Sequence, residues 1–142
     1  SEDNVKGQRN FANKIWNISR FVLDGPNGNR YKTKTSNEDD GWIKKELKET
    51  TRKVTKALDK YRLNEAAEEI YDFVWHKFAD IYIEKSKNRR EEAQLTLEFV
   101  LTECLKLLHP FMPFVTETIW SELKNLRKYP DQLLITSSWP KA

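Results

Sequence analysis

Apolar residues recur at helical spacing through most of this sequence, and this periodicity restricts the fold more than any other feature. Phe11, Ile15, Ile18 and Val22 follow one another at the spacing that places side chains on one face of an α-helix. Only 4 Gly and 5 Pro occur in 142 residues, which is poor in the turn residues that an all-β protein needs. The sequence therefore predicts an all-α protein.

The same periodicity predicts helices within a single domain that spans residues 1–142. They are expected at about residues 5–24, 40–61, 64–87, 89–108 and 113–128. Gly25 and Pro26 end the first helix, and Asn88 with Glu91 is typical of an N-cap with its reciprocal carboxylate at the start of the fourth. The polar segment at about 25–38 is predicted to be a mobile loop. We expect an antiparallel bundle of four to five helices.

Each expected helix has an inward apolar face. In the second helix this face consists of Ile43, Leu47, Val54, Leu58 and Tyr61. The last apolar stretch, residues 133–139, is short and is expected to be extended.

The composition argues against several functions. Cys104 is the only cysteine, which leaves no internal disulfide and no cysteine metal cluster. The two histidines, His76 and His109, form no catalytic pattern and no Gly-rich phosphate loop occurs, so we expect no catalytic residue, cofactor or metal in this chain. Apolar runs are too short to span a membrane, and no signal peptide opens the chain. We expect a cytoplasmic protein without a membrane partner, and the start at Ser1 and abrupt end at Ala142 indicate an excised fragment.

One aromatic residue of the first helix lies on the polar face. Phe21 falls among Lys14, Asn17 and Arg20, opposite Ile15. An aromatic ring among amide and cationic side chains fits a surface that stacks on RNA bases and holds phosphates. Alternatively, Phe21 covers a neighbouring helix or loop, and the sequence leaves both interpretations open.

The third helix shows the same kind of exception near its end. Ile83 falls on the acidic face, next to Glu84. If the ends of the first and third helices are adjacent, Phe21 and Ile83 form two apolar contacts on one outward surface, which favours RNA binding. Two basic clusters could hold phosphates or be solvated. They are Arg30, Lys32 and Lys34 in the loop, and Lys85, Lys87, Arg89 and Arg90 at a helix junction.

Three strings carry a resemblance to a known family. Residues 9–22 read RNFANKIWNISRFV, residues 59–84 contain NEAA, YDFVW and DIYIE, and residues 107–114 read LLHPFMPF. In this order they resemble the anticodon-binding domain of valyl-tRNA synthetases, which are class I aminoacyl-tRNA synthetases. The resemblance covers nearly the whole chain, although the third string occurs in looser form in leucyl- and isoleucyl-tRNA synthetases.

The resemblance implies a fold and a function. The fold is the helical bundle of a class I synthetase anticodon-binding domain, and the partner is the anticodon stem-loop of the valine-specific tRNA. The parent ligase attaches valine to this tRNA with ATP, but its catalytic and editing domains are absent here, so the isolated chain is expected to have no catalytic activity. Remaining domains of the same synthetase are further partners.

Residues matching the family's RNA-contact positions are Lys14, Arg20, Phe21, Ile83 and Glu84. On this basis Phe21 stacks on an anticodon base and Ile83 packs against a neighbouring base. Glu84 accepts a hydrogen bond from an exocyclic amine, while Lys14 and Arg20 hold phosphates or a base edge.

Two alternatives remain from the sequence. One is the equivalent domain of an isoleucyl- or leucyl-tRNA synthetase. The other is a helical protein-interaction module with Phe21 and Ile83 as apolar anchors. RNA binding should weaken steeply with salt, whereas an apolar interface should not.

Overall fold

The computed structural model describes residues 2–26, 37–127, 133–134 and 137–142. Within these ranges the chain is helical and contains no β-strand. The fold prediction of an all-α bundle is therefore confirmed. Most of the predicted loop at about 25–38, including Arg30, Lys32 and Lys34, lies outside the described residues. Of residues 133–139, the structure describes 133–134 and 137–139, which form no β-strand, and the expected extended segment stays a prediction.

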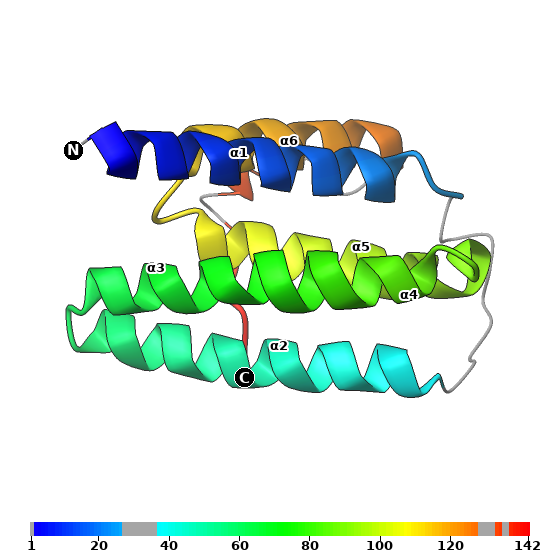
Figure 1. The fold of residues 1–142 in the computed structure, drawn as a ribbon, viewed down its shortest axis with the longest axis horizontal. Helices are drawn as coiled ribbons and strands as arrows, with labels where there is room; N and C mark the ends of the chain where they lie inside the picture. The colour runs from blue at the N-terminus through cyan, green and yellow to red at the C-terminus, as the bar shows by residue number, and fades with distance from the viewer. Residues whose placement is uncertain (1, 27–36, 128–132, 135–136) are drawn as a thin grey trace.

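The five expected helices are present, and one of them is divided into three segments. The bounds are α1 Glu2–Leu23, α2 Glu38–Asp59, α3 Leu63–Asp72, the π-helix η2 Phe73–Ile83, α4 Glu84–Ser86, α5 Arg90–Leu108 and α6 Pro113–Arg127. The segments α3, η2 and α4 follow one another without a break and form one rod (Figure 1). Each successive rod reverses direction, so α1, α3–α4 and α6 run one way while α2 and α5 run the other.

Helix ends follow local chemistry at some positions and long-range contacts at others. At the start of α2, the Asn37 side chain accepts a hydrogen bond from the Asp39 backbone N–H at 2.8 Å, as an N-cap does. The predicted cap by Asn88 is wrong, because α5 begins after Arg89, which makes no side-chain cap bond. The Arg89 guanidinium is instead bound to Asp40 of α2, so a distant contact sets this helix start.

The turn after α2 corrects the expected inward position of Tyr61. Its φ is 58° and its side chain is 91% exposed. The Tyr61 N–H donates to the Leu58 carbonyl at 3.0 Å, and the Arg62 N–H donates to the Ala57 carbonyl at 2.8 Å. This is the hydrogen-bond pattern of a Schellman motif, in which the residue after the helix adopts the left-handed conformation. Tyr61 therefore points outward because it ends the helix.

The π-helix changes which residues of the third rod face inward. Buried positions recur every four residues along it, at Ala66, Ile70, Val74, Phe78, Tyr82 and Ser86. In a straight α-helix each four-residue step turns about 40° beyond a full turn, so five steps would rotate this stripe by about 200°. A π-helix closes its hydrogen bonds over five residues and is wider, which keeps the stripe facing the core. For the same reason Ile83, beside Tyr82, is buried rather than outward.

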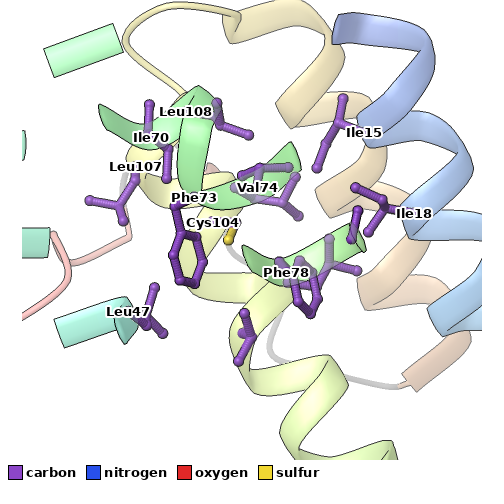
Figure 2. Packing of buried hydrophobic residues seen from close by; sticks show 14 of the residues in the cluster. Ile15, Ile18, Leu47, Ile70, Phe73, Val74, Phe78, Cys104, Leu107 and Leu108 are labelled. Carbon is purple, nitrogen blue, oxygen red and sulfur yellow. The ribbon is translucent and has the colours of Figure 1, made fainter. Parts of the chain in front are cut away.

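The core lies between all five rods. The face predicted for α1 is confirmed, because Phe11, Ile15, Ile18 and Val22 are buried. Figure 2 shows Ile15 and Ile18 directed at residues of the third rod and of α5. The sulfur of Cys104 lies in the same cluster, and complete burial raises the pKa of its thiol. Among the described helices, none combines the length and apolarity needed to cross a bilayer.

Candidate RNA interface

The two helix ends singled out from the sequence lie at the same end of the bundle. Since α1 and the third rod run in the same direction, their C-terminal ends are at one end, together with the start of α5 (Figure 1). Lys14 of α1 also contacts η2, with its Nζ 3.7 Å from a carboxylate oxygen of Asp80 and 4.9 Å from the ring centre of Trp75. The adjacency that the RNA interpretation required is present.

The C-terminal end of α1 is bound by two side chains of α5. The Arg90 Nη2 donates to the Phe21 carbonyl at 2.8 Å, and the Gln94 Nε2 donates to the Val22 carbonyl at 2.8 Å. Carbonyls in the last turn of a helix lack intrahelical partners, and a cation there is favoured by the helix dipole. These bonds fix the position at which α1 ends.

Phe21 is neither fully exposed nor fully buried. Its side chain is partly accessible and packs against the core cluster. The guanidinium carbon of Arg90 lies 4.1 Å from the centre of its ring, a cation–π contact. The packing interpretation of Phe21 is therefore confirmed, while the ring surface that stays accessible leaves base stacking as a prediction.

Gly25 leaves room for two side chains of α5 that reach this end of α1. A Cβ atom built on Gly25 would lie 1.9 Å from the Arg90 Nη2 and 2.3 Å from the Gln94 Oε1. Both distances are well inside van der Waals contact, so a side chain at position 25 would displace the two groups that hold the end of α1. Gly25, which follows the end of α1, therefore leaves space for the side chains of Arg90 and Gln94. We call these two side chains, with their hydrogen bonds to α1, the clasp.

The other predicted contact residues differ in accessibility. Arg20 is exposed and forms no ion pair with the described residues. Glu84 is exposed and lies 2.7 Å from the Nζ of Lys87. Lys14 is partly exposed. The expected outward contact of Ile83 is wrong, since only 6% of this residue is accessible, and the π-helix is the reason.

The basic cluster at the junction of the third rod and α5 is already partnered. Lys85 lies 3.5 Å from Asp39, and Lys87 pairs with Glu84. Arg89 binds Asp40, and Arg90 binds Phe21. Lys85, Arg89 and Arg90 therefore link this junction to α2 and α1, whereas Lys87 pairs within its own rod.

A buried polar network behind this surface was not foreseen from the sequence. The Arg89 guanidinium donates two hydrogen bonds to the Asp40 carboxylate, at 2.8 and 3.1 Å, and the Tyr82 hydroxyl donates a third at 2.5 Å. The three residues come from α2, η2 and the start of α5. Their separation in the chain hides the network from any local pattern.

The network shifts the ionisation of its members. Burial alone would raise the pKa of the Asp40 carboxyl, but hydrogen bonds from Arg89 and Tyr82, with the Arg89 charge, outweigh burial and lower this pKa below its ordinary value. Burial and the bond to Asp40 raise the pKa of Tyr82, and the bond to Asp40 raises the pKa of Arg89. Asp40 and Arg89 are therefore a stable ion pair at neutral pH.

The two histidines have local structural partners. His76 is exposed and lies between Asp72 and Asp80, at 3.9 and 3.4 Å. The Nδ1 of His109 lies 2.9 Å from the Thr116 hydroxyl oxygen. Across the described ranges, no group of three His, Cys, Asp or Glu side chains is arranged to hold a metal ion.

Comparison with known proteins gives a consistent family assignment. Residues 40–142 match a family model described as the anticodon-binding domain of tRNA ligase. The valine–tRNA ligase of Carboxydothermus hydrogenoformans is 41% identical over 149 residues, covering 98% of this chain and 16% of that protein. That of Geobacter sulfurreducens is 39% identical over 156 residues, covering 100% and 17%. The chain thus spans about a sixth of the length of these curated relatives.

The fold also matches a solved structure. In a ternary complex of Agrobacterium radiobacter K84 LeuRS with tRNA and LeuAMS, the LeuRS chain superposes with a TM-score of 0.75 at 18% identity. The match covers 99% of this chain and 17% of that chain. At this identity the likeness concerns the fold.

Proposed function

The chain belongs to the family of anticodon-binding domains of tRNA ligases, and from this premise we propose that it holds the anticodon stem-loop of a valine tRNA within a valine–tRNA ligase. The observation that carries the choice of valine is identity of about 40% to valine–tRNA ligases over nearly the whole chain. The equivalent domain of a leucyl- or isoleucyl-tRNA synthetase is the nearest alternative. The LeuRS likeness supports only the fold that these enzymes share.

The proposed contact surface is the end of the bundle where α1 and α4 finish. Phe21 stacks on an anticodon base, Arg20 holds a phosphate or base edge, and Glu84 accepts a hydrogen bond from an exocyclic amine. Lys14, partly exposed, adds a cation farther along α1. Ile83 is not part of the proposed surface, because it is buried.

The contacts between Arg90 and Phe21 support this assignment, because they lower the free-energy cost of binding a base. Arg90 fixes both the carbonyl and the ring of Phe21. A base that stacks on this ring therefore meets a group whose position is already set, and the cost of ordering it on binding is reduced. This preorganisation distinguishes Phe21 from Tyr61, an aromatic residue that is 91% exposed.

We propose that valine activation with ATP and transfer to tRNA belong to parts of the parent enzyme outside this chain. The lengths of the relatives support this division, since the matched region is about a sixth of each. The chain itself would then have no catalytic activity and no cofactor, and the other domains of the synthetase would be its partners in the cytoplasm.

Replacing Phe21 by alanine should weaken binding of a valine anticodon stem-loop by about tenfold or more. Base stacking on an aromatic side chain contributes roughly 1–3 kcal/mol, which corresponds to that change in Kd. The dissociation constant of the chain would be measured by fluorescence anisotropy with the labelled stem-loop. A stem-loop with a substituted anticodon, measured in parallel, reports base recognition.

Phe114→Ala is the matched control for this variant. Phe114 is 87% exposed and lies at the start of α6, at the opposite end of the bundle, so its loss should leave the Kd unchanged. Thermal melting of both variants separates binding from folding. If Phe21→Ala binds as tightly as the wild type, or loses binding only because it no longer folds, Phe21 is a packing residue and does not read the RNA.

The salt dependence of the Kd tests the alternative that the chain is a helical protein-interaction module. Binding through phosphates weakens steeply as salt rises, whereas an apolar contact does not. If the wild-type chain binds both stem-loops equally at every salt concentration, the anticodon assignment fails.

A further inference from the structure

Helix α2 carries a line of cations that the proposed anticodon contact does not use. Lys44, Lys48, Arg52, Lys56 and Lys60 are all exposed, and each is four residues after the previous one; we call them the basic row. Residues 44–62 hold eight Lys and Arg side chains against three carboxylates. Since the whole chain has a net charge of only +3, the remainder is net negative. The acidic first turn of α2, Glu38, Asp39 and Asp40, lies outside this range, so positive charge is concentrated between Lys44 and Arg62, just past the end of α2.

This arrangement is unfavourable for the helix alone. Residues four apart are neighbours on a helix surface, and like charges at this spacing repel and destabilise it. Within the row, only Arg52 has a carboxylate partner on α2, Glu49. The next positively charged side chains, Lys45 and Lys53, add to the same field. An anionic partner with several charges would relieve the repulsion.

The basic row borders a groove between α2, α5 and the C-terminal segment. The groove has a volume of about 470 Å³, and Lys44, Lys45, Lys48 and Lys141 line it with a single carboxylate, Glu103. Phe99 of α5, which is 46% exposed, forms part of the wall. The C-terminal segment is held in place because the Trp139 Nε1 donates to the Thr55 hydroxyl at 2.9 Å.

A separate depression lies toward the far end of α2, on the flank where α3 packs. It has a volume of about 330 Å³ and is lined by Arg52, Lys53, Lys56 and Lys60, by the paired Arg62 and Glu65, and by a second carboxylate, Glu69. Because each four-residue step turns about 40° beyond a full turn, the basic row turns by about 160° and crosses the outer face of α2 diagonally, from the α5 flank to the α3 flank. An extended polyanion fits this distribution better than a single small anion does.

We propose that the basic row and its groove bind the sugar-phosphate backbone of the RNA stem that adjoins the anticodon loop. The inference rests on the proposed function, which supplies an RNA as the partner. Lysine binds phosphate as a point charge, and such contacts position an RNA without reading its sequence. Helix α2 begins at the bundle end where α1 and α4 finish (Figure 1), so an RNA whose loop lies there can extend its stem along α2.

The test is a double variant, Lys44→Gln with Lys48→Gln. It should bind the valine stem-loop on the order of tenfold more weakly at about 0.1 M salt, and the slope of log Kd against log salt should fall by about one to two. The stem-loop with a substituted anticodon should lose affinity by the same factor. The loop sequence as a single strand without its stem should bind as it does to the wild type.

A matched control removes the same charge from another place. Lys6→Gln with Arg9→Gln neutralises two exposed cations at the start of α1, at the opposite end of the bundle, and should change Kd little. Thermal melting should show that neither pair destabilises the chain. Equal effects of the two double variants would mean that only net charge matters, and the proposed row would be wrong.

The outcomes separate this inference from the anticodon assignment. If Phe21→Ala weakens binding while Lys44→Gln/Lys48→Gln does not, the anticodon surface stands and the basic row is not an RNA contact. A change in the ratio of the two stem-loop affinities would show base reading by the row, against a backbone contact. If the wild-type chain binds no stem-loop, both proposals fall.

Discussion

Arg89→Met should lower the free energy of unfolding by about 3–5 kcal/mol, the usual cost of removing one partner from a buried ion pair. Arg89 and Asp40 are only 13% and 10% exposed in their side chains. Without the guanidinium, the Asp40 carboxylate keeps one hydrogen bond, from Tyr82, and no countercharge at contact distance among the described residues. Urea denaturation followed by circular dichroism measures the change.

Two companion variants test the cause. Arg52→Met removes the cation of an exposed pair with Glu49 and should lower the free energy of unfolding far less than Arg89→Met does, because water screens an exposed pair. Asp40→Leu combined with Arg89→Met should recover most of the loss, because replacing both partners leaves no unpaired buried charge. A loss as large in the double variant as in Arg89→Met would show that packing, and not the ion pair, dominates.

The pH dependence of this effect has a definite sign. The pKa of Asp40 is lowered in the folded chain, so its stabilising contribution is present above the unfolded pKa of about 3.9 and is lost as pH falls through the folded pKa. In Arg89→Met the unpaired carboxylate gains by taking up a proton. The stability difference between wild type and variant should therefore shrink as pH falls below about 4.

Phe73→Ala should destabilise the chain by about 3–5 kcal/mol, the range for truncating a fully buried phenylalanine. Phe73 has no accessible surface and is the first residue of the π-helix. Figure 2 shows its ring pointing into the core cluster. Truncation leaves a cavity that the surrounding helices can fill only in part. The midpoint of urea unfolding measures the loss.

Phe114→Ala is the corresponding control, because Phe114 is 87% exposed. Its substitution should change stability by less than about 0.5 kcal/mol. If Phe73→Ala and Phe114→Ala have the same midpoint of urea unfolding, the packing of the third rod differs from that described above.

Local periodicity was sufficient to predict α1 and its inward face. Phe11, Ile15, Ile18 and Val22 lie at α-helical spacing, and the helix that contains them is regular. The same reasoning failed at Ile83, because η2 is not α-helical and no residue type signals a π-helix in advance. The predicted inward position of Tyr61 was wrong for a related reason, since a tyrosine in the left-handed conformation is uncommon.

The candidate site was predictable only where it depends on single residues. Arg20 and Glu84 are exposed as expected, because their positions follow from one helix each. The clasp on Phe21 joins residues 69 positions apart, and the Asp40 pairs join residues 42 and 49 apart. These pairs depend on how the helices pack together, and the periodicity of a single helix does not predict that packing.

Complete burial of Cys104 gives the chain an intrinsic reporter of opening. It is the only cysteine, and its thiol is inaccessible and its pKa is raised in the folded state. An alkylating reagent needs the thiolate and can therefore react only in molecules whose bundle has transiently opened around α5. When opening and closing are fast relative to alkylation, the labelling rate measures the equilibrium population of open molecules. One sulfur atom thus converts the stability of the whole core into a rate of chemical modification under native conditions.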